Sequence, residues 1–556
     1  MAPAKKNIVP LLIWLSAALI SIAVAGAHFY FLHHAGGFWR DEVNLINLSG
    51  GQSWADMEKD SFPLLMPLLI RAWLGAGGTE TGLRGLGLLI GLGILLALWL
   101  ASWKITRRPP LLGLALFAAN STLIIFGDSL RAYGLGCLGI ILATFAGGFF
   151  VLKPSWSRAG WLAAFAILSV QTLYHNAILV GAICLAAALA GLRHRNRAAV
   201  IGPLVAGALA AVSLLPYLPI LVGDREASGS PRTGLKLPRL MEGFQDSFGF
   251  PVAQYIWVWG LLAAVVLFCG WRVFRESRSA TLSSDETRSA GDLTLFAAAT
   301  LALASIGFLV FLWLAAFPSQ SWYWLPLMAV AVVCLDLAWP QWPERMHTAI
   351  VVLALGTVLI ATPVAGRFLD YHYTNVDVWA RALKNQAAPD DYIVVVPWFD
   401  GITFEHYFKN PTAWDTLPPI SDHRTHRFDL VKIQLQNTNA LAPVLERMTT
   451  ALQSGHRVWV LAEQGWMGVP EPGTPAAAPL PPAPLGPWGW SEMPYTMVWV
   501  SQTAHYLGDH SREFVRVKSL AAGQRIIENT ELFVADGWRA DAHLLHPAPT
   551  SEPARP

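Results

Sequence analysis

Two adjacent carboxylates, Asp41 and Glu42, follow the first long apolar stretch of the sequence, in a short segment between residues 36 and 44. Charged residues make up only 14% of the 556 positions, so this pair stands out in the chain. At a membrane boundary a carboxylate can act as a general base, or bind a metal ion or a sugar. Adjacent carboxylates gain nothing as membrane anchors. The pair is therefore the first candidate for a reactive site.

The composition places this pair in a membrane protein. Hydrophobic residues make up 54% of the sequence, and the mean hydropathy is +0.43. Soluble domains carry about 25% charged residues, so a content of 14% indicates that long segments have lipid as their solvent. The net charge of +2 gives no reason to expect nucleic acid as a partner.

About eleven apolar runs are long enough, or nearly long enough, to cross a bilayer, which takes roughly 20 residues. They lie near residues 8–31, 83–103, 110–127, 133–152, 160–174, 177–191, 198–222, 254–271, 293–316, 322–338 and 347–364. The runs at 160–174 and 177–191 are short and could form a tight hairpin that does not cross fully. The apolar segment 62–74 is too short to span and contains two prolines, so we expect it to lie in the membrane interface.

The distribution of Lys and Arg predicts the orientation, because cytoplasmic loops carry an excess of both. With the N-terminus inside, the inner connections hold most of these cations, whereas the short outer connections at 172–176 and 317–321 hold none. We therefore expect a multi-pass protein of the plasma membrane, the inner membrane of a bacterium. Its N-terminus is cytoplasmic, and everything after about residue 365 lies outside.

The chain after residue 365 has the pattern of a soluble α/β domain, covering 366–556. Residues 392–397 and 456–461 have the pattern of buried strands, and the amphipathic stretch 441–452 between them predicts a helix ending at Gly455. This order favours a partly parallel sheet. Residues 470–487 form a Pro-rich loop, and 547–556 a disordered tail. The fold class is thus a mostly α polytopic membrane domain, 1–365, followed by an extracytoplasmic α/β domain.

Several outer connections carry polar or aromatic residues that could line a common cavity with the long first outer loop, residues 32–82. These residues are Asp128 and Arg131 in one turn, Tyr174 and His175 in the next, and Trp322 and Tyr323 in a later one. The alternative is that each of them caps a helix or anchors it at the interface.

The order of these elements resembles the GT-C membrane glycosyltransferases, and is most similar to family 39, which includes protein O-mannosyltransferases and lipid A aminoarabinose transferases. The matching elements are Asp41-Glu42; Asp60 with Phe62-Pro63-Leu64 and Arg71 and Arg84; Arg131-Ala132-Tyr133-Gly134-Leu135; Tyr174-His175; and Trp322-Tyr323-Trp324-Leu325-Pro326. The resemblance covers residues 1–365. The chain departs from it at Ser61-Phe62, where relatives usually have His-Pro, and at Ser129, where they often have an acidic residue.

The resemblance implies a polyprenyl-phosphate sugar as donor and a lipid, glycan or protein acceptor at the outer leaflet, among membrane lipids. Asp41 would be the general base that accepts the proton of an acceptor hydroxyl, with Glu42 as its partner. Arginine forks pair with phosphate oxygens at two points. The donor and phosphate site would therefore comprise Lys59, Asp60, Arg71, Arg84, Asp128, Arg131 and Tyr133, with Tyr174, His175, Trp322 and Tyr323 lining the substrate cavity.

The sequence leaves a metal cofactor open. Asp41, Glu42 and Asp128 could hold Mg²⁺ or Mn²⁺ through oxygen ligands, but some relatives are expected to work without metal. Two other classes of protein compete with the enzyme: a lipid or ion transporter or flippase with an outer accessory domain, and an assembly protein. Ion-coupled carriers usually bury ionisable residues at mid-span, and no charged residue stands there in this sequence.

Overall fold

The computed structural model describes residues 8–51, 62–75, 78–194, 196–219, 237–276, 285–315, 320–471, 473–486, 489–518 and 523–540. Its contacts divide the chain into two compact units. A helical unit comprises residues up to His34 and most of the chain from Leu48 to Asp370. A sheet unit comprises Ala35–Asn47 together with the chain from Tyr371 onward.

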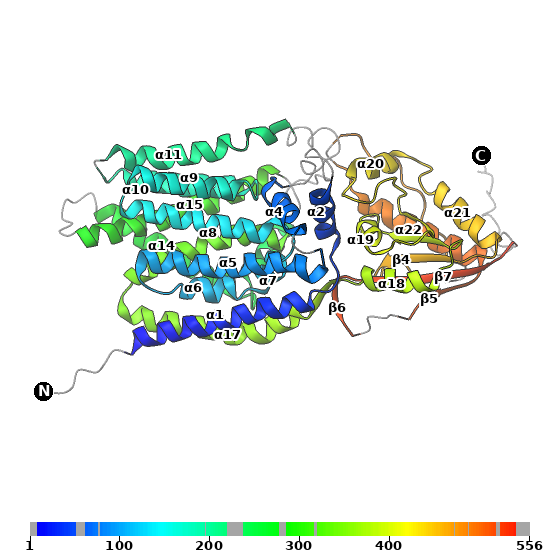
Figure 1. The fold of residues 1–556 in the computed structure, drawn as a ribbon, viewed down its shortest axis with the longest axis horizontal. Coiled ribbons are helices and arrows are strands. Elements are labelled where there is room, and N and C mark those ends of the chain that lie inside the picture. The colour runs from blue at the N-terminus through cyan, green and yellow to red at the C-terminus, as the bar shows by residue number, and fades with distance from the viewer. Residues whose placement is uncertain are drawn as a thin grey trace, which may run out of the picture. The chain divides into compact units, whose positions relative to one another are not determined.

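The helical unit consists of long helices that run side by side in Figure 1. They are α1 (Val9–His34), α4 (Leu65–Leu74), α5 (Glu80–Thr106), α6 (Leu111–Gly113), the π-helix η1 (Leu114–Ala118), α7 (Ser121–Gly127), α8 (Ala132–Leu152), α9 (Trp156–Val170), α10 (Asn176–Gly191), α11 (Arg197–Val212), the short η2 (Leu215–Tyr217), α13 (Leu237–Phe248), α14 (Tyr255–Glu276), α15 (Asp285–Ala315), η3 (Ser321–Trp324), α16 (Leu325–Ala338), η4 (Trp339–Gln341) and α17 (Glu344–Leu369).

Eight helices among the described residues are long and apolar enough to cross a membrane. Large apolar side chains on them point outward: Trp257 is 78% exposed, Leu359 75% and Ile22 70%. A soluble protein buries such side chains, so these faces are suited to lipid. The predicted runs 160–174 and 177–191 are the shorter apolar helices α9 and α10, of 15 and 16 residues. The expected interfacial segment contains helix α4.

The predicted single span at 110–127 is wrong in detail, because this segment is broken into α6, η1 and α7. Asn120 causes the second break: its side chain accepts the N–H of Thr122 at 2.9 Å and caps α7. The segment nevertheless returns along α5. It starts just after the C-terminal end of α5, and at its far end Asp128 packs against Gly87 and Gly91, near the N-terminal end of that helix.

The sheet unit contains a five-stranded sheet of order β3-β2-β4-β7-β5 and a two-stranded sheet of β1 and β6. Its elements are β1 (Tyr371–Thr374), α18 (Val376–Gln386), β2 (Tyr392–Val396), α19 (Asp400–Tyr407), β3 (Ala413–Thr416), α20 (Phe428–Gln436), α21 (Ala442–Gln453), β4 (Val458–Glu463), α22 (Glu492–His510), β5 (Ser511–Arg516), β6 (Arg525–Glu528) and β7 (Thr530–Trp538).

The predicted strand–helix–strand order is confirmed as β2, α21 and β4, and β2 pairs with β4 in parallel. Gly455 ends the intervening turn with φ +80, a conformation that favours glycine. The sheet is only partly parallel, as expected, because β7 runs antiparallel to both β4 and β5. The described part of 470–487 forms neither helix nor strand, and the tail 547–556 lies outside the described residues.

Candidate functional site

Asp41 and Glu42 occupy the first turn of helix α2 (Arg40–Gly50), where acidic side chains complement the helix dipole. The Glu42 side chain is completely buried, and its Oε2 accepts the backbone N–H of Trp39 at 3.3 Å. A glutamate that reaches back from the third helical residue to the residue before the helix is half of a capping box. Glu42 therefore fixes the start of α2.

Asp41 has a different environment, because its side chain is 18% exposed and contacts a histidine. Its Oδ1 lies 3.0 Å from Nε2 of His426, and Oδ1 of Asn44 accepts the backbone N–H of His426 at 2.9 Å. The His426 ring is stacked on Phe428, with 5.8 Å between centroids and 15° between planes. The partner of Asp41 is thus held in place by both its backbone and its ring.

His426 is a candidate functional residue that the sequence did not predict. It belongs to the segment Asp422-His423-Arg424-Thr425-His426-Arg427, whose density of histidine and arginine was the available signal. Nothing in the spacing connects it to Asp41, which lies 385 positions earlier.

Arg40, beside Asp41, is surrounded by carboxylates. Its Nη1 lies 2.6 Å from Glu528, and its guanidinium lies 4.1 Å from the centre of the Phe399 ring. Loss of water would lower the pKa of Arg40, but the charges of Glu528, Asp41 and Asp400 raise it overall. Burial also raises the pKa of Glu528, to about 7, against the opposing effect of Arg40.

In the helical unit, predicted substrate residues gather in one aromatic cluster around Tyr133. The Tyr133 ring centre lies 5.4 Å from that of Phe62, 6.2 Å from Trp322 and 6.1 Å from Tyr323. The His175 ring follows at 6.4 Å from Tyr323. Residues from four separate connections of the helical unit therefore meet in one place.

Arg131 adds a positive charge to this cluster. Only 5% of the residue is exposed, and its guanidinium carbon lies 4.6 Å from the centre of the Phe62 ring. A buried guanidinium stacked on an aromatic ring is held in one orientation and is suited to two-point contact with phosphate oxygens.

Asp128 and Arg84 both lie near Gly87 of α5, where this helix packs closely against the chain at Asp128. The Asp128 carboxylate, 7% exposed, lies 2.7 Å from Nδ1 of His28 on α1. A Cβ at Gly87 would lie 1.8 Å from the Asp128 carbonyl oxygen, so only glycine fits there. Arg84, also 5% exposed, stands one helical turn before Gly87. His28 was missed by the sequence analysis because it lies inside an apolar run.

The other predicted residues are more scattered. Tyr174 contacts the Tyr217 ring at 5.6 Å, and the Tyr217 hydroxyl donates to Gln171 at 2.8 Å. Arg71 lies in the last turn of α4 and is exposed. Lys59 and Asp60 lie outside the described residues.

The predicted metal ligands do not form a metal site in the described part of the chain, where no three His, Cys, Asp or Glu side chains group to hold an ion. Asp41 and Glu42 belong to the sheet unit and Asp128 to the helical unit. Asp41 pairs with His426 and Glu42 caps its own helix. We therefore derive no chemical step through a metal.

No protein-family model matches the chain, and no curated protein sequence matches it. Solved structures that are similar include ArnT from Cupriavidus metallidurans bound to undecaprenyl phosphate, at 13% identity and a TM-score of 0.45, over 81% of this chain and 93% of that one. The oligosaccharyltransferase of Archaeoglobus fulgidus is similar in two structures. In complex with Zn and sulfate it shows 12% identity and a TM-score of 0.42, over 81% of this chain and 68% of the other. Tethered to an acceptor peptide with the NVT sequon, it shows 13% identity and a TM-score of 0.43, over 92% of this chain and 73% of the other.

At these identities and TM-scores, the similarity assigns no activity and no residue role to this chain. What the chain does has to be inferred from its own residues.

Proposed function

We propose that this chain is an integral membrane glycosyltransferase that moves a sugar from a polyprenyl-phosphate donor to an acceptor at the outer face of the membrane. The observation that carries the proposal is the cluster of Arg131, Phe62, Tyr133, His175 and Tyr323, where a buried cation lies over one ring of a connected aromatic cluster. Such a site offers a fixed charge for a phosphate and flat apolar faces for a sugar or a lipid.

In the proposed reaction the bond between the anomeric carbon and the donor phosphate oxygen breaks, and a bond from that carbon to the acceptor oxygen forms. The acceptor proton passes to the carboxylate of Asp41, which a hydrogen bond to His426 holds in position. The released polyprenyl phosphate carries negative charge, which Arg131 and Arg84 stabilise. Glu42 acts on Asp41 through the helix start that it fixes.

The positions of the buried charges favour an enzyme over an ion-coupled carrier. In the described helices, the buried charged residues of the helical unit are Arg84, Asp128, Arg131, Asp292 and Asp336. Arg84, Asp292 and Asp336 lie near helix ends, and Asp128 and Arg131 lie between α7 and α8. A carrier that couples transport to ions needs such groups near the middle of the membrane.

The experiment that tests this function has two arms. Mass spectrometry of envelope lipids, glycans and proteins, with and without the chain, should find one glycosylated species that disappears when the chain is absent. The purified chain in liposomes should then release polyprenyl phosphate from a synthetic polyprenyl-phosphate hexose or pentose when envelope extract is added. Movement of the intact donor across the bilayer without release would show a flippase and would overturn the proposal.

A further inference from the structure

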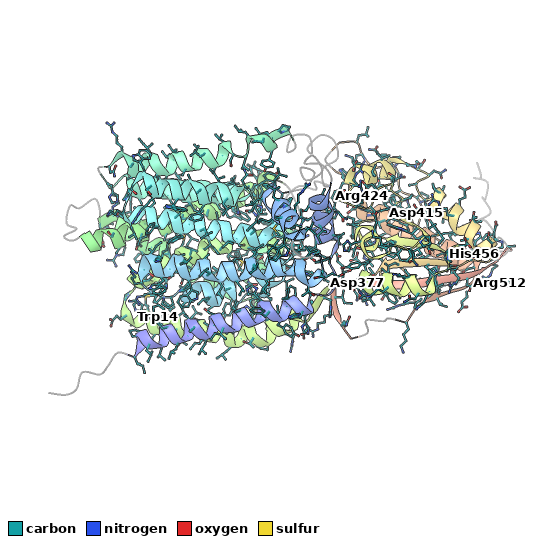
Figure 2. All side chains as sticks on the ribbon, in the orientation of Figure 1. Trp14, Asp377, Asp415, Arg424, His456 and Arg512 are labelled. Atoms are coloured by element: carbon teal, nitrogen blue, oxygen red, sulfur yellow. The ribbon has the colours of Figure 1, made fainter. Side chains whose placement is uncertain are left out.

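The sheet unit contains a cavity of about 710 Å³ that has no part in the proposed reaction, although its lining includes part of the segment 422–427 that carries His426. Its lining runs from Glu405 in α19 to Arg424, before the start of α20, and includes Asp415 and Arg424, which Figure 2 labels. The residues that decide its chemistry are Glu405, Lys409, Trp414, Asp422, His423 and Arg424. The volume lies within the range of small-molecule sites, roughly 300–1,000 Å³.

Two polar atoms of the lining residues have no hydrogen-bond partner among the described residues. They are Oε2 of Glu405 and Nδ1 of His423, and both are shielded from solvent. A buried acceptor or donor without a partner destabilises the fold, so a ligand that bonds to both would recover that loss.

Three other charged residues of the lining, Asp415, Asp422 and Arg424, are already paired. Asp422 binds Arg427 at 2.8 Å and Arg424 at 3.2 Å. Asp415 accepts the Tyr392 hydroxyl at 2.7 Å and pairs with Arg447. These pairs leave little net charge to attract a phosphate or a cationic peptide.

His423 adds little charge to the lining. Burial lowers the pKa of His423 to about 4, against the opposing effect of Asp422, so its ring is neutral at pH 7. Burial also raises the pKa of Glu405. The lining is therefore suited to an uncharged ligand with many hydroxyl groups.

Trp414 supplies a rigid aromatic wall. Its ring packs against Phe404, edge to face at 5.1 Å, and against the His423 ring at 4.5 Å. Its indole nitrogen donates to no described residue. Sugar rings pack their C–H faces on such indoles while their hydroxyls bond to carboxylates, amides and imidazoles.

We infer that this cavity binds a short neutral oligosaccharide, with a sugar ring on Trp414 and hydroxyls bonded to Glu405 and His423. The inference goes beyond the proposed function, because it concerns binding at a second site and needs no donor lipid. It can hold whether or not the chain transfers a sugar.

Saturation-transfer NMR tests the inference on the full chain in lipid nanodiscs, with maltose, cellobiose, lactose, mannobiose and diacetylchitobiose as probes. At least one disaccharide should receive saturation and bind with a Kd in the millimolar range or below. Trp414→Ala should raise that Kd at least tenfold, and Glu405→Gln about threefold or more. Glu405→Gln keeps the size of the side chain, so it tests the site even if Trp414→Ala fails to fold.

Trp466→Ala is the matched control, since Trp466 is a half-buried tryptophan of the same unit that does not line the cavity. Its Kd should equal that of the parent. Saturation of none of the five probes, or equal binding by the Trp414 and Glu405 variants, would overturn the inference. So would binding of a sulfated disaccharide alone, because that ligand would be held by Lys409 and Arg424 as an anion.

Discussion

Asp41 and His426 lie 385 positions apart in the chain, and the Asp41 carboxylate meets the His426 imidazole at 3.0 Å. Arg40 also lies near this carboxylate, with Nε 3.9 Å from the same Oδ1. Asp41 is thus a partly exposed carboxylate with two nitrogen groups near one of its oxygens. This arrangement allows a sharper set of predictions for the pair and for the cluster around Tyr133.

Asp41→Asn should lower kcat by about 100-fold or more, because an amide cannot accept the acceptor proton. The asparagine oxygen can still contact His426, so the melting temperature should change little. Steady-state transfer assays and thermal melts measure the two effects. Asp390→Asn, at an exposed position, is the control and should retain the parent rate. Parent activity of Asp41→Asn would remove Asp41 as the base.

Glu42→Gln should retain kcat within about threefold, because a glutamine oxygen can still accept the Trp39 N–H and keep the capping box. Glu42→Ala loses that bond and should destabilise the sheet unit by about 1 kcal/mol or more. Denaturant unfolding compares the two variants. An inactive but stably folded Glu42→Gln, beside an active Asp41→Asn, would exchange the roles within the pair.

Arg131→Lys should raise the apparent KM for the lipid donor about tenfold, because lysine keeps the charge but loses the two-point fork and the stacking on Phe62. Arg158→Lys is the matched control: Arg158 also lies over a phenylalanine, Phe149 at 3.7 Å, but outside the cluster. Donor titrations measure both variants. An unchanged KM for Arg131→Lys would mean that this arginine has a packing role only.

The stability of the sheet unit should depend on pH in two opposite ways. The pKa of Glu528 is raised from 4.5 to about 7. Its contribution to the folding stability is therefore full below pH 4.5 and is lost as the pH rises through 7. The pKa of His423 is lowered from 6.5 to about 4, so its contribution is full above pH 6.5 and is lost as the pH falls through 4.

Melting temperatures between pH 4 and pH 8 check these signs. Relative to the parent, Glu528→Gln should gain several degrees, on the order of 5 °C, on going from pH 5 to pH 8. His423→Gln should gain instead as the pH falls from 7 to 4. Variants that parallel the parent over the whole range would contradict both assignments.

The orientation is tested by fused reporters. A reporter active only outside the cytoplasm should be active after Leu369 and silent after Arg195. This result requires an odd number of crossings before Leu369. The reverse pattern would place the proposed site on the cytoplasmic face of the membrane.

Local patterns in the sequence predicted the helices and strands whose formation depends on neighbouring residues in the chain. The continuous apolar run 392–397 corresponds to β2, which is buried along its whole length, and the amphipathic stretch 441–452 corresponds to α21, whose buried face follows the helical period. The break at Asn120 was missed because it lies within a long, mostly apolar run, and one side-chain cap decides it.

The candidate site was predicted only for residues on the short connections between apolar runs. Tyr133, Trp322 and Tyr323 fall into that class and do meet. His28 and His426 do not, since their partners Asp128 and Asp41 lie 100 and 385 positions away. Contacts of that range depend on how the whole chain packs, which no spacing in one sequence records.

The assignment of Ala35–Asn47 to the sheet unit has a consequence for the synthesis of the protein. Ala35 accepts the backbone N–H of Tyr373 at 2.8 Å, and Asn44 holds His426. Roughly 320 residues separate this segment from Tyr371, and ribosomes add about 5–20 residues per second. The segment must therefore wait some tens of seconds for its partners, during which the chaperones of its compartment would be the first proteins to meet it.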